Sequence, residues 1–157
     1  MNKKRIVLIV GLSILFLSLV VFIILGPGKF SREKTFSYVT VVFNDNKPIF
    51  EDAVRTGDFS SLLNVEGVRS VDDPVETKSN GHGIITINMG GVGFGPATGY
   101  YGIFYSPKDN LSRARLSPCP GDEYLVPTED GGFEYKGNDY YYVRNIEGHF
   151  YYYEAFY

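Results

Sequence analysis

The hydrophobic pattern along this chain changes its period twice. An unbroken apolar run covers residues 6–25, apolar residues one helical turn apart occupy residues 46–55, and a two-residue alternation prevails from residue 84 onward. Helices bury one side chain in every three or four, whereas strands alternate between two faces. Helices first and strands later predict an α+β fold, in which one or two helices pack on an antiparallel sheet.

The first apolar run has the length of a membrane span. Its twenty uncharged residues follow a basic start at residues 3–5, and at about 1.5 Å each they reach about 30 Å, the thickness of a bilayer's hydrocarbon core. The run is longer than the apolar part of a secretory signal and has no small-residue cleavage site after it. The sequence therefore predicts an uncleaved transmembrane anchor over residues 6–25, with a cleaved signal as the alternative.

The basic start favours a cytoplasmic N-terminus, although Lys29, Arg32 and Lys34 beyond the span reduce the charge bias. The prediction is a single-pass plasma-membrane protein. A cytoplasmic tail (1–5) and the anchor (6–25) precede a stalk (26–35) and a single extracytoplasmic domain (36–157).

Charge excludes one class of partner. All 18 acidic residues but only 12 of the 15 basic ones lie beyond the anchor, so the exposed part carries about −6. Nucleic-acid binding needs a basic surface, and we expect none. The partners expected are the membrane itself and an envelope protein or cell-wall component.

The helical part is best defined at residues 46–55. Asn46 is a capping residue, Pro48 suits a first helical turn, and Gly57 provides the end. Residues 36–43 fit either a helix or a strand, and the helix is favoured. A helical turn at residues 58–63 and a short strand within residues 65–71 are also expected.

Two strands are predicted at residues 84–89 and 100–106. Between them, residues 90–99 are rich in glycine but match neither the dinucleotide-binding nor the Walker spacing of phosphate loops. The stretch is interpreted as a flexible or bulged connection that could form the rim of a binding site.

The last 18 residues, which hold seven of the 13 tyrosines, predict a hairpin. A type I turn at residues 145–148 would place Tyr142 opposite Tyr152 and Val143 opposite Tyr151. Phe150 would then share the core face with Tyr142, Tyr152 and Phe156, under the helix that holds Ile49, Phe50 and Val54. The opposite face would be covered or used, and its candidate contact surface is Tyr141, Tyr151, Tyr153 and Tyr157.

No motif indicates catalysis, a cofactor or a metal. Cys119 lies between two prolines and is interpreted as an exposed loop thiol. His82 and His149 lack the spacing of metal ligands, and the acidic pairs at residues 72–73 and 129–130 fit turns.

One resemblance adds to this picture. Residues 101–109, with the pattern Y-G-x-[FY]-Y-S-x-x-D, and the YYYE of residues 151–154 resemble uncharacterised small anchored or secreted proteins of Gram-positive bacteria. That group has no established activity, so the resemblance implies only an envelope location. Many of its members carry tryptophan in the tail, which this chain lacks.

These observations support two hypotheses. The first is a membrane-anchored, non-enzymatic binding or interaction module at the cell envelope, with an unknown ligand. The alternative is an envelope hydrolase that acts on wall polymer through unrecognised carboxylates. A cleft with two facing acids, one of raised pKa, would favour the hydrolase.

Overall fold

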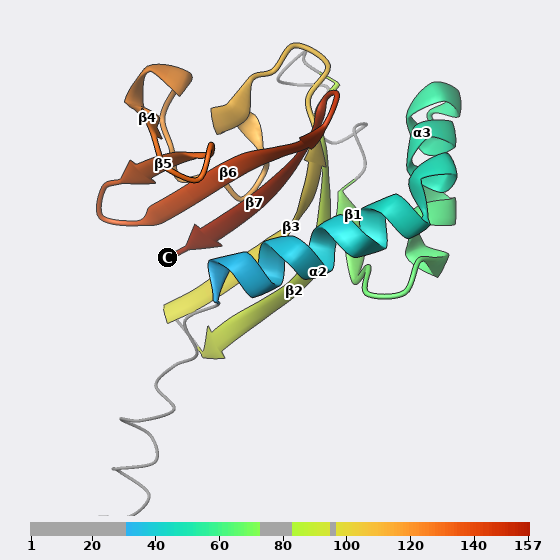
Figure 1. Cartoon of the computed structure of the whole chain (residues 1–157), viewed down its shortest axis with the longest axis horizontal. Coiled ribbons are helices and arrows are strands. Elements are labelled where there is room, and N and C mark those ends of the chain that lie inside the picture. The colour runs from blue at the N-terminus through green and yellow to red at the C-terminus, as the bar shows by residue number, and fades with distance from the viewer. Residues whose placement is uncertain (1–30, 73–82, 95–96) are drawn as a thin grey trace, which may run out of the picture.

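A computed structural model describes residues 31–72, 83–94 and 97–157 of the chain. They form an α+β domain in which helices pack on a seven-stranded antiparallel sheet (Figure 1). The strand order is β1-β2-β3-β7-β6-β5-β4. The strands are β1 (Ser70–Asp72), β2 (Ile85–Phe94), β3 (Ala97–Tyr105), β4 (Val126–Pro127), β5 (Phe133–Lys136), β6 (Tyr140–Glu147) and β7 (Phe150–Phe156). The predicted α+β class with an antiparallel sheet is confirmed.

Two helices precede the sheet in the sequence. Helix α2 (Arg32–Asp45) lies across one face, and α3 (Lys47–Thr56) stands at one end of it (Figure 1). Gly57 ends α3 with a left-handed φ of 75°, which glycine adopts at no steric cost. The predicted helix at residues 46–55 is confirmed, as is the helical preference for residues 36–43. Residues 32–35, which the sequence assigned to the stalk, form the first turn of α2.

An aromatic core lies between the helices and the sheet. Phe43 of α2, Phe50 of α3 and Phe150 of β7 pack together, with ring centroids 4.9–6.2 Å apart. Burying each such ring stabilises the fold by about 2–3 kcal/mol. Ile49, expected in this core, is instead 37% exposed, because it lies on the outer side of α3. The buried members of this core include Val39, Phe43, Phe50, Ala53, Leu62, Ile85, Ile87, Met89, Ile103, Tyr142, Phe150 and Tyr152.

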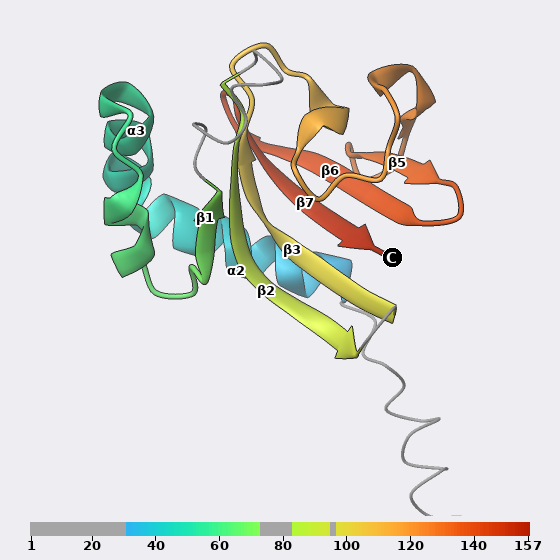
Figure 2. The same ribbon diagram turned by 180° about the vertical axis from the view of Figure 1, so that it is seen from behind.

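A second core lies on the other face of the same sheet. The irregular segment between β3 and β4, residues 106–125, crosses this face (Figure 2). Its Leu111, Ala114, Leu116 and Cys119 pack against the sheet side chains. Those side chains are Phe104, Tyr141, Val143, Tyr151, Tyr153 and Ala155 of the strands, together with Ile84 just before β2. Both faces of the sheet are therefore covered at its centre, which explains why both faces of the terminal hairpin are aromatic.

The hairpin has the predicted faces but a different register. Tyr142 pairs with Glu154 rather than Tyr152, and Val143 pairs with Tyr153 rather than Tyr151. The turn is the two-residue loop Gly148-His149, with a positive φ at Gly148 as a type II′ turn requires, and an irregularity follows Asn145. The register is thus shifted by two residues. A shift by an even number leaves every side chain on its predicted face.

The glycine-rich stretch is strand rather than a connection. Residues 90–94 continue β2, and residues 97–99 begin β3. A bulge between Asn88 and Gly90 shifts the register, so only the bulged part of the prediction is confirmed. At Gly102, opposite the bulge, an added Cβ would overlap the carbonyl oxygen of Ile87, and only glycine permits this close approach.

The remaining small elements agree in part with expectation. A short 3-10 helix at Ser60–Asn64 confirms the helical turn, but only residues 70–71 of the expected 65–71 strand belong to β1. The cytoplasmic tail, the anchor and residues 26–30 of the stalk lie outside the described residues. Within the residues that the structure does describe, no helix is long and apolar enough to span a bilayer.

Candidate binding edge

The tyrosines proposed as a contact surface are mostly inside the protein. Tyr141 and Tyr153 are fully buried and Tyr151 is 8% exposed, whereas Tyr157 is 44% exposed. The exposure expected for the first three is wrong, because residues 106–125 cover their face. The Tyr141 hydroxyl donates to the carbonyl of Leu111 within that segment, at 2.8 Å.

Cys119 is also buried, contrary to expectation. It is 6% exposed and its thiol donates to the carbonyl oxygen of Gly121 at 3.2 Å. Burial raises the pKa of this thiol. The position in a loop was predicted correctly, but the loop packs Cys119 into the second core.

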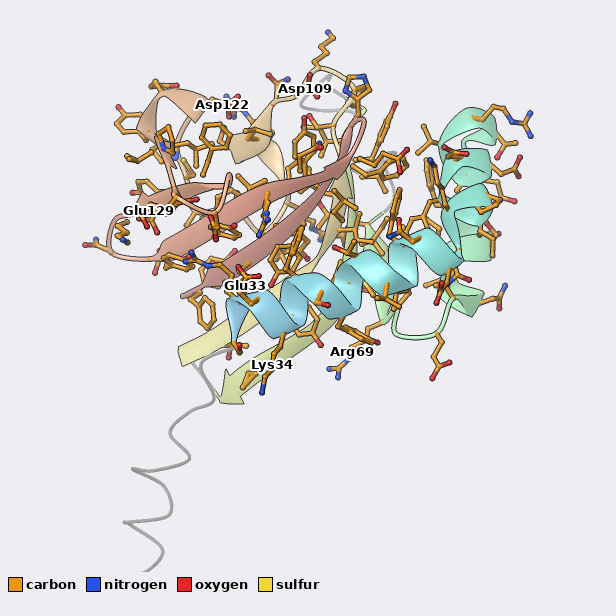
Figure 3. The ribbon with its side chains drawn as sticks, in the orientation of Figure 1. Glu33, Lys34, Arg69, Asp109, Asp122 and Glu129 are labelled. Atoms are coloured by element: carbon orange, nitrogen blue, oxygen red, sulfur yellow. The ribbon has the colours of Figure 1, made fainter. Side chains whose placement is uncertain are left out.

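His149 and Tyr151 share one carboxylate at the tip of the hairpin. The Tyr151 hydroxyl donates to Oδ1 of Asp109 at 2.6 Å, and Nδ1 of His149 lies 2.7 Å from the same oxygen. Asp109 stands at the top of the molecule in Figure 3 and has a left-handed φ of 55°. The hydrogen bonds from Tyr151 and His149 lower the pKa of Asp109. Among the described residues no cluster of three or more metal-ligating side chains occurs, and His82 lies outside them.

A groove of about 290 Å³ runs beside this tip, between α3 and the hairpin turn. Phe43, Tyr105 and Phe150 form its apolar floor. Lys47 of α3 makes an ion pair with Glu147 of β6 at its rim. Lys47 and Arg55 line the groove together with Glu51 and Glu147. Their charges balance, so the groove offers no net charge to a ligand.

A buried polar cluster ties the start of α2 to the sheet. The guanidinium of Arg32 stacks over the Tyr142 ring, with Cζ 4.0 Å from the centroid, and donates to the Tyr140 hydroxyl. The same group lies 3.5 Å from Asp130, 3.8 Å from Glu134 and 4.0 Å from Glu154. Arg32 therefore connects the helix to the β4–β5 loop and to strands β5, β6 and β7.

Two carboxyl groups of this cluster titrate in opposite directions. Burial raises the pKa of Glu154, which is 3% exposed, and this effect outweighs the Tyr152 hydrogen bond and Arg32. Burial would also raise the pKa of Asp130, but hydrogen bonds from Thr128, Tyr142 and the Gly132 amide, together with Arg32, hold it at about 2. Both carboxylates are thus engaged within the protein.

The outer edge of β2 differs from these closed clusters. β1 pairs only with residues 86–88 of β2. Beyond them, residues 90–94 have β3 on one side and no partner strand on the other among the residues that the structure describes (Figure 2). Every second backbone N–H and C=O of an edge strand points outward and can pair with an added strand. The outer side of residues 90–94 of β2 can therefore pair with an added strand.

A hollow of about 320 Å³ adjoins this open edge. Gly90, Gly91 and Val92 of β2 line it together with Thr98 and Tyr100 of β3. At Gly91 an added Cβ would lie 2.8 Å from the carbonyl oxygen of Gly99. The glycines thus allow β2 and β3 to approach closely and also leave the edge without bulky side chains.

Arg69 stands at the inner end of the hollow, with Ser70 and Asn88 beside it. Its backbone N–H donates to the carbonyl oxygen of Asn88 at 2.8 Å. Its side chain is exposed, lies beside β2 (Figure 3), and has no ion-pair partner within the described ranges. The chain then leaves the sheet edge through Gly67, which has a φ of 91°. We name the set of Arg69, Ser70, Asn88, Gly90, Gly91 and Val92 the β2 edge site.

The sequence predicted that this stretch could form the rim of a binding site but did not predict that it belongs to two strands. The strands predicted at residues 84–89 and 100–106 leave a glycine-rich linker in which no turn motif is recognised. The missing turn was the available signal that the two strands continue into the linker. Tyr101 packs over Gly90 and Phe156 over Gly99. Aromatic rings on the neighbouring strand can compensate for glycine in a sheet.

Comparison with known proteins adds no assignment. No protein-family model, curated protein or solved structure matches this chain.

Proposed function

We propose that this chain is a membrane-anchored, non-enzymatic interaction module at the cell envelope. Residues 6–25 hold it in the plasma membrane as a single span with its N-terminus in the cytoplasm. The α+β domain extends outside the membrane. Its partner is an envelope protein, of which an extended segment adds as a strand to the β2 edge site. The observation that carries this proposal is the unpaired outer side of residues 90–94.

Strand addition at the β2 edge site has more physical support than binding at the tyrosine face or in the groove beside α3. Backbone groups on a strand edge give affinity without demanding a particular side-chain sequence, and strand addition is a recurring mode of peptide recognition. The tyrosine face is covered, and the groove beside α3 presents no net charge. The β2 edge site alone among these surfaces combines unpaired backbone with an unpaired cation in the described part of the chain.

The hydrolase alternative has less support. Among the residues that the structure describes, the carboxyl group with a raised pKa is that of Glu154. It is 3% exposed, accepts a hydrogen bond from Tyr152 and lies 4.0 Å from Arg32. A wall polymer would need to reach this acid directly. In the groove beside α3, Glu51 and Glu147 both pair with Lys47. These acids are therefore already engaged.

The topology is tested in cells. The full chain should sediment with membranes, and protease added to intact spheroplasts should digest the domain. A soluble product would contradict the anchor, and a domain that is digested only after lysis would contradict its orientation.

The interaction is tested by photo-crosslinking in the same cells. A photoreactive amino acid in place of Val92, on β2, should give a specific adduct of higher mass. The control is the same substitution at Val126, which lies on β4 and is 60% exposed. Adducts of equal yield at both positions, or none at Val92, would contradict an interaction through the β2 edge site.

A further inference from the structure

We infer that the segment bound at the β2 edge site is the C-terminal end of a polypeptide, whose free carboxylate is bound by the guanidinium of Arg69. This inference rests on the proposed function and specifies the partner of the same site. It follows from three features of the site: the space available, the direction of β1, and the charge of Arg69.

The space available for an added strand is limited at one end. The carbonyl oxygen of Asn88 already accepts the N–H of Arg69, and residues 86–88 are paired with β1. A guest strand can therefore extend along residues 90–94 but stops opposite Gly90. An internal segment would have to turn away from the sheet there, as this chain does at Gly67. A chain end needs no such turn.

The charge of Arg69 selects between the two chain ends. β1 is antiparallel to β2, so a guest in line with β1 and of the same direction would also be antiparallel to β2. Its C-terminus would then reach the inner end of the hollow, where Arg69 lies. A guest of the opposite direction would bring an α-ammonium group to the same place, and Arg69 would repel it. An arginine binds a carboxylate through two parallel hydrogen bonds.

The side-chain preference follows from the hollow itself. Gly91 is next to Tyr100 across the β2–β3 pair, and both residues line the hollow. The Tyr100 ring lies against the position of the missing Gly91 side chain and gives the hollow an apolar wall, which a small apolar guest residue can contact. The inferred ligand is thus an extended C-terminal peptide with small or β-branched residues on alternate positions.

A second copy of this chain is a less suitable occupant. The β2 strand of a second copy (Ile85–Phe94) is an internal segment, so it presents no free carboxylate to Arg69.

The test uses the full-length chain in detergent micelles and a fluorescent eight-residue peptide of alternating threonine and valine. The peptide is prepared with a free C-terminal carboxylate and as the C-terminal amide. We expect the amide to bind about tenfold more weakly or worse, because a charge-assisted hydrogen bond is lost. Fluorescence anisotropy measures both affinities.

Two variants assign this difference to a residue. Arg69→Gln should remove the preference for the free carboxylate and leave the affinity for the amide unchanged. Lys136→Gln, which removes the same charge on β5 at the opposite edge of the sheet, should keep the preference. Arg69 is exposed, so its variant should unfold at the same temperature as the parent chain.

Several results would overturn the inference. Equal binding of the acid and the amide would do so, as would an amidated peptide with an internal aspartate that binds as tightly as the free acid. Binding of neither peptide, or reversible self-association that the free-carboxylate peptide does not compete with, would also overturn it. None of these results decides the proposed function, which the crosslinks at Val92 test independently.

Discussion

At the β4 edge of the sheet, the outermost strand has only two residues and one of them is Pro127, which has no amide hydrogen to offer. The adjacent β5 ends in the charged Lys136. At the β2 edge, residues 90–92 carry neither proline nor charge, and β1 leaves them unpaired. Natural sheets close their edges with short strands, proline and lysine. One edge of this sheet has these protections and the other does not.

The two edges also differ in how they are attached to the helices. Arg32 of α2 contacts Asp130 and Glu134, which precede and belong to β5. The open half of β2 has no comparable ion pair in the described part of the molecule. Ion pairs thus fix the β4 edge to α2, whereas the outer backbone groups of residues 90–94 have no partner strand among the described residues.

Gly102→Ala should lower the free energy of unfolding by about 3 kcal/mol or more. The new Cβ would overlap the Ile87 carbonyl oxygen, and backbone atoms cannot move aside without breaking the β2–β3 pair. The control is Gly121→Ala, whose Cβ would first meet the carboxylate of Glu123, the far end of a flexible side chain. Chemical denaturation measures both, and equal losses would show that the tight β2–β3 approach is not required.

Arg32→Gln should cost about 2 kcal/mol of stability, because Glu154 loses the cation next to it while it stays buried. Amide hydrogen exchange should accelerate at residues 133–136 and stay unchanged at residues 98–105. Arg55→Gln is the control, since Arg55 pairs with Asp52 at the surface and is 74% exposed. Faster exchange in β2 and β3 instead would contradict the attachment of the β4 edge by Arg32.

Glu154→Gln tests the titration in this cluster. In the folded protein the pKa of Glu154 is above its ordinary value of 4.5. The free energy of unfolding of the parent chain therefore falls as the pH rises from 4.5 through this raised pKa. Glutamine stays neutral and removes this fall. The variant should therefore gain stability relative to the parent chain as the pH rises from 4.5 through the raised pKa of Glu154. Parallel curves of unfolding free energy against pH would contradict the raised pKa.

The protections of the β4 edge should have the smallest effect on stability. Lys136→Thr combined with Pro127→Thr should change the free energy of unfolding by less than about 1 kcal/mol. The same change removes a charge and supplies a new backbone donor, so the variant should self-associate in sedimentation experiments. A variant that stays monomeric would show that these residues do not protect the edge.

The sequence predicted those features that depend on local pattern. Asn46, Pro48 and Gly57 bounded α3, and the alternation around Phe150 assigned every hairpin side chain to the correct face. The register was shifted by two because residues 145–148 and the loop Gly148-His149 both satisfy the preferences of hairpin turns. Local preferences cannot choose between two such turns when either one places Phe150 in the core.

Features that depend on distant segments were not predictable in this way. The burial of Tyr141 and Tyr153 depends on Leu111 and Ala114, which lie in a segment without periodicity. The open edge depends on strand order, because β1 covers β2 for only three residues. The sequence of residues 90–94 does not indicate which strand pairs with them.

Hydrogen exchange of the full-length chain with the free-carboxylate peptide tests the central claim most directly. Bound peptide should slow exchange at the outward-facing amides of residues 90–92, while residues 133–136 of β5 keep their rates. Slowed exchange at β5, or no change at residues 90–92 under conditions where the peptide is bound, would contradict strand addition at the β2 edge site.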